Sequence, residues 1–241
     1  MADPLWPAPS ELEALVRRLE WLPQLLRRQQ EEQLVALVPL DPDWLEQQRS
    51  AALADQSLEQ YLAQRRWSEA DFDLHLRRPE ALRRFAAQRF GPGLEERFLQ
   101  SQGARDEVIY SLLRVRDPGL ARELWIRLEE GEVTFAEAAQ QFSEGDESHR
   151  KGVMGPMQIG VLQPPQLAEW LRALRQGEIS PPRVLGEWQV LLRLEKLTPA
   201  RFDEAMRERL LQEELNAFFD KRVQQLLAGE AVEELHYDAQ T

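Results

Sequence analysis

The chain has 241 residues, with 30 basic and 42 acidic side chains and a formal net charge of −12 at pH 7. This balance argues against nucleic acid as the main partner, because phosphate binding requires concentrated Lys and Arg. Cysteine is absent, which excludes disulfides, thiolate catalysis, Cys-type zinc sites and iron–sulfur clusters.

Residues 1–7 contain neither a basic region nor the apolar stretch of a secretory signal, so we expect a cytoplasmic protein. No run of about 18 apolar residues occurs, and we therefore expect no membrane span.

The first third of the sequence predicts helices. Apolar residues recur at helical spacing between residues 10 and 67. Pro39 is expected to end one helical stretch, and Asp41 followed by Pro42 has the pattern of a new helix start. Ser68 with Asp71 predicts a capping box for a further helix, which we expect Pro79 to interrupt.

This helical region carries the strongest basic cluster of the chain. A solvated or interhelical face is favoured over a nucleic-acid site, since no stacking aromatics alternate with the arginines. The cluster comprises Arg77, Arg78, Arg83, Arg84 and Arg89.

The glycine-rich triplet 91–93 predicts a break, followed by a short helix over 94–99 and a linker at 101–105. The character of the sequence then changes. Residues 108–115 are rich in β-branched and aromatic side chains, which predicts a strand.

Two capped helices follow, the first from Asp117-Pro118 to Leu128 and the second over 135–142 after Thr134. Residues 144–165 are expected to form a long loop, and loops of this length usually serve a function.

The remaining pattern predicts a helix near 167–174, a strand over 188–194 and an amphipathic helix over 202–227. The acidic end, 228–241, is expected to be frayed. The fold class is therefore α+β, with a small sheet domain inside a helical frame.

Four segments resemble, in the correct order, the motifs of parvulin-type peptidyl-prolyl isomerases. They are Thr134–Glu144, Gly152–Gly155, Leu174–Pro182 and Trp188–Leu194, with Val108–Val115 as the first strand. The resemblance covers about 90 residues. It implies a parvulin-like domain, with a small antiparallel sheet and helices, that binds polypeptides containing proline.

The helical region resembles the N-terminal part of SurA- and PrsA-like foldases, in which a C-terminal helix packs on the N-terminal part. Cyanobacterial proteins described as peptidylprolyl isomerases are similar over most of the chain. The implied domains are a helical domain at 1–103, a parvulin-like domain at 104–198, and a C-terminal helix with an acidic tail at 199–241.

In this family a Met, Leu and Phe pocket holds the proline ring, beside two histidines, a Cys or Asp, and a Ser or Thr. The resemblance places Met157, Leu162 and Leu167 in the pocket and predicts that they line one partly open groove. Met154 and Trp188 are the further predicted substrate-binding residues.

The polar positions depart from the family pattern. Tyr110 and Ser111 lie near the first histidine position, Gln189 replaces the second, and Gly145 stands at the Cys/Asp position. Gly186 lies near the Ser/Thr position. A reduced catalytic set of Ser111, Tyr110 and Gln189 is the resulting expectation.

Three functions remain open from the sequence: an isomerase with a degenerate polar site that assists client folding, a non-catalytic chaperone or adaptor, which would serve a secretion pathway, and a purely structural domain. No cofactor or metal is expected, because the three histidines are far apart and fit no ligand spacing.

The partners are expected to be proline-containing or unfolded polypeptides, and the charge favours basic or apolar clients. The sequence does not define the oligomeric state.

Overall fold

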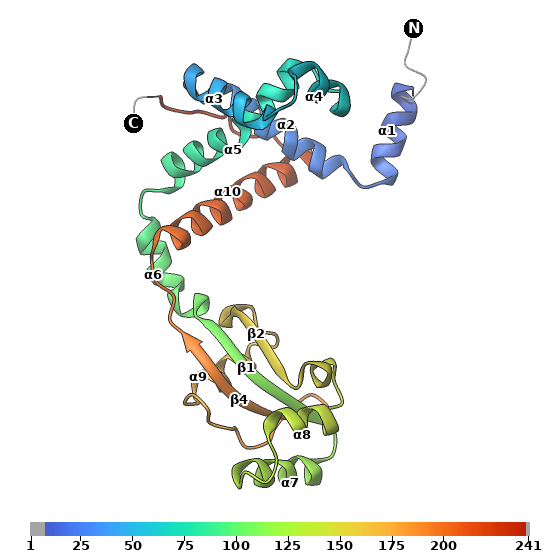
Figure 1. The fold of residues 1–241 in the computed structure, drawn as a ribbon, viewed down its shortest axis with the longest axis vertical. Coiled ribbons are helices and arrows are strands. Elements are labelled where there is room, and N and C mark those ends of the chain that lie inside the picture. The colour runs from blue at the N-terminus through green and yellow to red at the C-terminus, as the bar shows by residue number, and fades with distance from the viewer. Residues whose placement is uncertain (1–7, 240–241) are drawn as a thin grey trace. The chain divides into compact units, whose positions relative to one another are not determined.

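The computed structural model describes residues 8–239, so the N-terminal residues behind the expectation of a cytoplasmic protein lie outside the described part. The chain forms two compact units (Figure 1). One contains the residues up to Glu95 together with those from Asp203 onward, and the other contains Glu96–Phe202. Each unit is described separately below.

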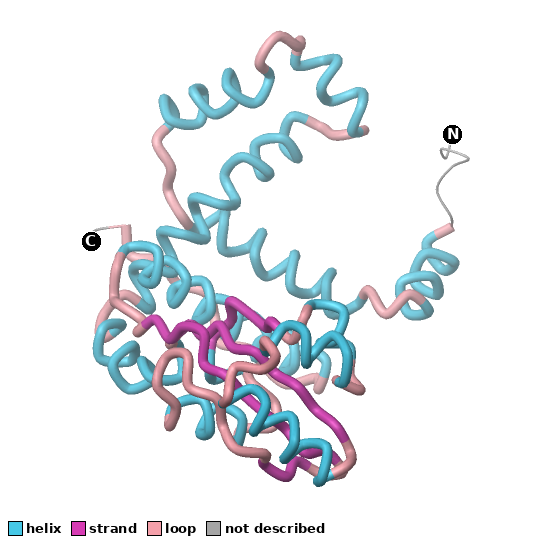
Figure 2. Tube along the Cα trace, turned by 60° about the horizontal axis from the view of Figure 1, so that its bottom comes forward, coloured by secondary structure: helices cyan, strands magenta, loops and turns pink. Residues whose placement is uncertain are grey.

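The first unit is helical (Figure 2). Asp41 caps α3 by accepting from the Asp43 backbone N–H, and Ser68 with Asp71 forms the expected capping box of α5. The helices are α1 (Pro9–Arg18), α2 (Leu22–Leu37), α3 (Pro42–Leu53), α4 (Leu58–Arg65), α5 (Glu69–Phe90), the start of α6 (Leu94–Arg105), and α10 (Glu204–Leu227).

The core of this unit lies where α2, α5 and α10 pack together. Its buried side chains include Leu34, Phe72, Phe85, Leu215 and Phe219. Burial on both sides of Pro79 explains why α5 continues through the proline, against expectation. The proline removes one backbone hydrogen bond, whereas the helix face on either side of it buries large apolar side chains.

The arginine cluster is interhelical, as the sequence favoured. Arg77 donates to the carbonyls of Val35 and Val38, and Arg84 donates to that of Pro39. Arg78 lies 4.0 Å from Glu31 on α2.

The acidic C-terminal segment is not frayed over its described part, which corrects the expectation. Arg222 donates to the backbone carbonyl of Glu233 at 2.7 Å, and Gln88 donates to that of Asp238 at 2.6 Å. Leu235 is buried. These contacts satisfy the polar backbone of the segment and anchor it to the helices.

The second unit contains a four-stranded antiparallel sheet with the order β2-β1-β4-β3, so the expected α+β fold class is confirmed (Figure 1). Its strands are β1 (Glu107–Val115), β2 (Val153–Gln158), β3 (Arg183–Leu185) and β4 (Trp188–Thr198). Its helices after α6 are α7 (Pro118–Glu129), α8 (Phe135–Phe142), α9 (Gln166–Arg172) and the 3₁₀ turns η1 (Asp146–Arg150) and η2 (Ile159–Val161).

Two expectations for this part of the chain were wrong. The expected linker 101–105 is the end of α6. The two compact units divide near residues 95 and 202, close to the domain bounds of 103 and 198 that the resemblance implied. The expected loop 144–165 contains β2, which forms an edge of the sheet by pairing with β1. Its Gly and Pro residues concealed this strand, since an edge strand tolerates residues that a central strand excludes.

The interior of the sheet domain provides a stability test. Leu113 on β1 is fully buried against α7 and α8, so we expect Leu113→Ala to destabilise the domain by about 2–5 kcal/mol. Hydrogen exchange of the β1 and β4 amides should become faster. Val184→Ala, at a side chain that is 66% exposed, is the control and should leave exchange unchanged. Equal exchange in both variants would contradict this packing.

Candidate functional site

The two faces of the sheet have separate hydrophobic cores. On one face, α9 and η2 pack against Val108, Tyr110 and Leu192. On the other face, α7 and α8 pack against Leu113, Val115 and Leu191. Because successive side chains of a strand point to opposite faces, residue parity decides which core a side chain joins.

The predicted substrate-binding residues lie together on the α9 face. Met154 and Met157 come from β2, Leu162 follows η2, Leu167 lies on α9, and Trp188 begins β4. Leu162 and Leu167 are each only 5% exposed, whereas both methionines and Trp188 are partly exposed. We call these five residues the apolar slot. Met154, Met157 and Trp188 lie at the partly exposed edge of this cluster, and Leu162 and Leu167 lie in its buried part.

Tyr110 lies on the same face, opposite Met154 in the β1–β2 pairing. Burial raises the pKa of the Tyr110 hydroxyl above its ordinary value, and the nearby Glu147 carboxylate adds to this effect. Tyr110 is therefore a neutral hydrogen-bond donor beside the apolar slot at physiological pH.

Ser111 and Gln189 lie on the opposite face and do not join Tyr110. Ser111 pairs with Arg193, and its hydroxyl donates to Glu195. Gln189 pairs with Val115, which belongs to the core under α7. The predicted catalytic set is thus divided between the two faces, because the sequence comparison placed residues by motif position and not by strand alternation.

An ion pair that the sequence reasoning missed borders the slot. The Nε of Arg114 lies 3.2 Å from Oε1 of Glu147, and the Ser143 hydroxyl donates to the same oxygen at 2.6 Å. Glu147 is buried, so the cation and the hydroxyl offset the cost of removing its charge from water. Only the unusual strand arginine, between Leu113 and Val115, signalled this pair in the sequence.

The ion pair occupies the space beside Gly145. A Cβ atom built on this glycine would lie 2.1 Å from the Arg114 guanidinium and 2.2 Å from Oε2 of Glu147. Glycine at this position, which the resemblance aligns with the family's Cys or Asp, therefore leaves room for the Arg114–Glu147 pair.

Two arginines hold the tryptophan of the slot. The guanidinium carbons of Arg114 and Arg116 lie 5.2 Å and 4.2 Å from the centre of the Trp188 ring. Arg116 is fixed by ion pairs with Glu144, at 2.6 Å, and Glu187, at 3.2 Å. Cation–π contacts of this kind keep the indole in place at the edge of the slot.

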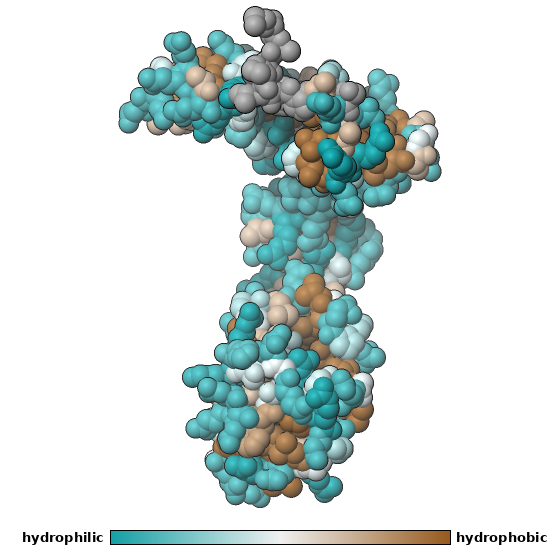
Figure 3. All heavy atoms as spheres, turned by 90° about the vertical axis from the view of Figure 1, so that its right-hand side faces the viewer, coloured by the Kyte–Doolittle hydropathy of each residue, from teal (hydrophilic) through white to brown (hydrophobic). Residues whose placement is uncertain are grey.

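A hollow of about 370 Å³ opens next to the slot. Met154 belongs both to the slot and to the lining of the hollow, and Glu147 connects the hollow with the ion pair. The lining residues are Asp146, Glu147, His149, Arg150 and Met154. On the face drawn in the space-filling view, hydrophobic patches of the sheet unit lie between hydrophilic residues (Figure 3).

Within residues 8–239 no group of three or more His, Asp or Glu side chains is arranged to hold a metal ion. In the same range no helix has the length and apolarity that a membrane crossing requires.

Comparison with known proteins assigns the sheet unit. Residues 119–190 match the family model described as Rotamase, the PPIC-type PPIase domain. The chain therefore contains a parvulin-type peptidyl-prolyl isomerase domain, with the apolar slot on the α9 face of its sheet.

One relative is similar over more residues than the family model matches. Chaperone SurA of Vibrio cholerae is 30% identical over 152 residues, which are 59% of this chain and 35% of SurA. The chain thus spans about a third of the length of this relative. PrsA of Bacillus anthracis is a similar solved structure, with 19% identity, a TM-score of 0.49, and coverage of 88% of this chain and 100% of PrsA.

The environment of Tyr110 predicts an alkaline titration. Its pKa is raised in the folded protein, so the stability conferred by the neutral hydroxyl is present below pH 10 and is lost as the pH rises beyond it. The phenolate absorbance difference between wild type and Tyr110→Phe should titrate above pH 10. In denaturant the same difference should have a midpoint of about 10. A folded midpoint at or below 10 would refute the buried position.

Proposed function

We propose that the protein is a parvulin-type foldase that binds proline-containing segments of polypeptide clients in the apolar slot and assists their folding. The convergence of Met154, Met157, Leu162, Leu167 and Trp188 on the α9 face of the sheet carries this proposal. The match of residues 119–190 to the isomerase domain and the identity with SurA support it.

The isomerisation requires rotation about one bond and no covalent chemistry. Rotation about an X–Pro bond must overcome about 18–20 kcal/mol of C–N resonance, without making or breaking a bond. A dry slot for the proline ring removes water from the amide and weakens the stabilisation of its charge-separated form. Groups that bind the twisted amide more tightly than the planar one lower the barrier.

Each residue of the slot has a defined role in this scheme. The methionines adapt to the proline ring, because the thioether chain is flexible and polarizable. Leu162 and Leu167 support them from below, and Trp188 closes one edge. The Tyr110 hydroxyl is the neutral donor on this face that is proposed to bond to the client carbonyl.

A second function, peptide binding without catalysis, is favoured by one specific observation. Ser111 and Gln189 face α7 and α8 instead of the slot, so neither reaches a client bound among the methionines. Catalysis then depends on desolvation and on Tyr110, a smaller polar set than the family uses.

Proline exchange measured by NMR distinguishes the two functions. We expect wild-type protein to accelerate cis/trans exchange of an Ala-Pro peptide, and Tyr110→Phe to reduce this rate by about tenfold, the effect of one hydrogen bond to the reacting amide. Met157→Ala should weaken peptide binding by about tenfold through lost apolar contact. Gln189→Ala is the control on the opposite face and should change neither quantity.

A wild-type exchange rate equal to that of buffer, with binding still sensitive to Met157→Ala, would select the non-catalytic function. Sensitivity to Gln189→Ala but not to Met157→Ala would refute the slot itself.

A further inference from the structure

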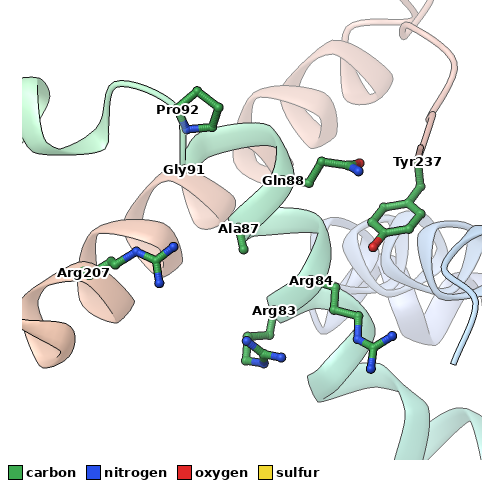
Figure 4. A pocket seen from close by; sticks show the side chains of 8 residues that line it. All are labelled: Arg83, Arg84, Ala87, Gln88, Gly91, Pro92, Arg207 and Tyr237. Atoms are coloured by element: carbon green, nitrogen blue, oxygen red, sulfur yellow. The ribbon is translucent and has the colours of Figure 1, made fainter. Parts of the chain in front are cut away.

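The helical unit contains a basic hollow that the isomerase function does not use. α5, α10 and the C-terminal segment enclose about 560 Å³ (Figure 4). The lining residues are Arg83, Arg84, Ala87, Gln88, Gly91, Pro92, Arg207 and Tyr237. Among residues 8–239, no acidic side chain lines this hollow, although the protein as a whole has a net charge of −12.

The two arginines of α5 share one carboxylate. Arg83 donates to Glu80 from Nε and Nη2, both at 2.8 Å, and Arg84 donates to Glu80 from Nε at 2.8 Å. These bonds lower the pKa of Glu80 to about 2, so it stays ionised at neutral pH. Arg84 also donates to the Pro39 carbonyl from Nη1. Both guanidinium groups still have N–H donors for a ligand, because each guanidinium has five.

Arg207 approaches the same hollow from α10. Its Nη1 lies 3.3 Å from Glu204, a contact between two largely exposed side chains that contributes little energy. A further carboxylate, Glu208, lines the apolar hollow described below and acts electrostatically on Arg83. Of the three arginines that line the hollow, Arg207 therefore has the weakest existing ion pair.

The C-terminal segment supplies the remaining wall. Gln88 donates to the Asp238 carbonyl at 2.6 Å and accepts from the Asp238 N–H at 3.2 Å. This pair of bonds fixes the segment beside Tyr237, whose hydroxyl points towards the hollow (Figure 4). The hydroxyl adds an uncharged donor to the guanidinium groups.

An apolar hollow of about 320 Å³ adjoins the basic one, and Arg83 lines both. Its apolar lining consists of Pro79, Leu82, Ala86, Leu211 and Leu215. A ligand that occupies both hollows has a carboxylate next to an apolar side chain. A small inorganic anion would fill only the first, whereas a polypeptide satisfies both.

We propose that the basic hollow binds Asp or Glu side chains of client polypeptides, with a neighbouring apolar side chain in the adjoining hollow. This names a client feature and so rests on the proposed foldase function. The net charge favours basic or apolar clients, but the hollow provides a local site for acidic ones. Bidentate guanidinium–carboxylate bonds give such a site its specificity.

Fluorescence anisotropy with the full-length protein tests the proposal. The probe is a labelled peptide of alternating Leu and Glu, compared with the same peptide carrying Gln in place of Glu. Arg207→Glu should weaken binding of the Glu peptide by about tenfold and leave the Gln peptide unaffected. Arg207→Gln should give a smaller loss in the same direction, and both variants should keep the wild-type circular dichroism.

Arg209→Glu is the matched control, because Arg209 is exposed on the same helix, has the same charge and does not line the hollow. An equal effect of Arg207→Glu and Arg209→Glu, or equal affinity for the Glu and Gln peptides, would overturn the proposal. So would tighter binding of a single-stranded oligonucleotide that depends on Arg207. Proline exchange at the apolar slot is measured separately, so failure here leaves the foldase function intact if exchange persists.

Discussion

The antiparallel pairing of β1 with β4 determines where chemistry is possible in this protein. Between Tyr110 and Val115 the register with β4 is unbroken, so side chains alternate strictly between the α9 face and the α7/α8 face. Both faces are covered by helices and have their own cores. A side chain on the wrong face is separated from the slot by the whole sheet, and no rotamer change brings it back.

This constraint explains how the isomerase domain differs from the family pattern. Of Ser111, Tyr110 and Gln189, only Tyr110 lies on the same face of the sheet as the apolar slot. Gly145 has no side chain, so the Arg114–Glu147 pair fits beside it. Arg114 also contacts the ring of Trp188. An ion pair and a tyrosine lie on the face of the sheet that carries the apolar slot. The five apolar residues lie together on this face, and the proposed client binding rests on them.

Much of the fold followed from local sequence signals. The capping residues Asp41, Ser68 and Thr134 mark real helix starts, because these signals act over a few residues. The continuation of α5 through Pro79, the helical end of α6 and the edge strand β2 depend on tertiary packing that no local pattern contains. In the site, the apolar slot was predictable from the motif order. The ion pair was not, since Arg114 and Glu147 are 33 positions apart and meet only in the folded sheet. The cytoplasmic location stays a prediction.

The central claim is that clients bind on the α9 face, and amide chemical shifts of the full-length protein test it most directly. Titration with an Xaa-Pro peptide should shift the amides of Met154, Met157 and Leu167 in β2 and α9, together with the Trp188 indole. The amides of α7 and α8 should remain unchanged. Shifts confined to α7 and α8, near Ser111 and Gln189, would contradict the account.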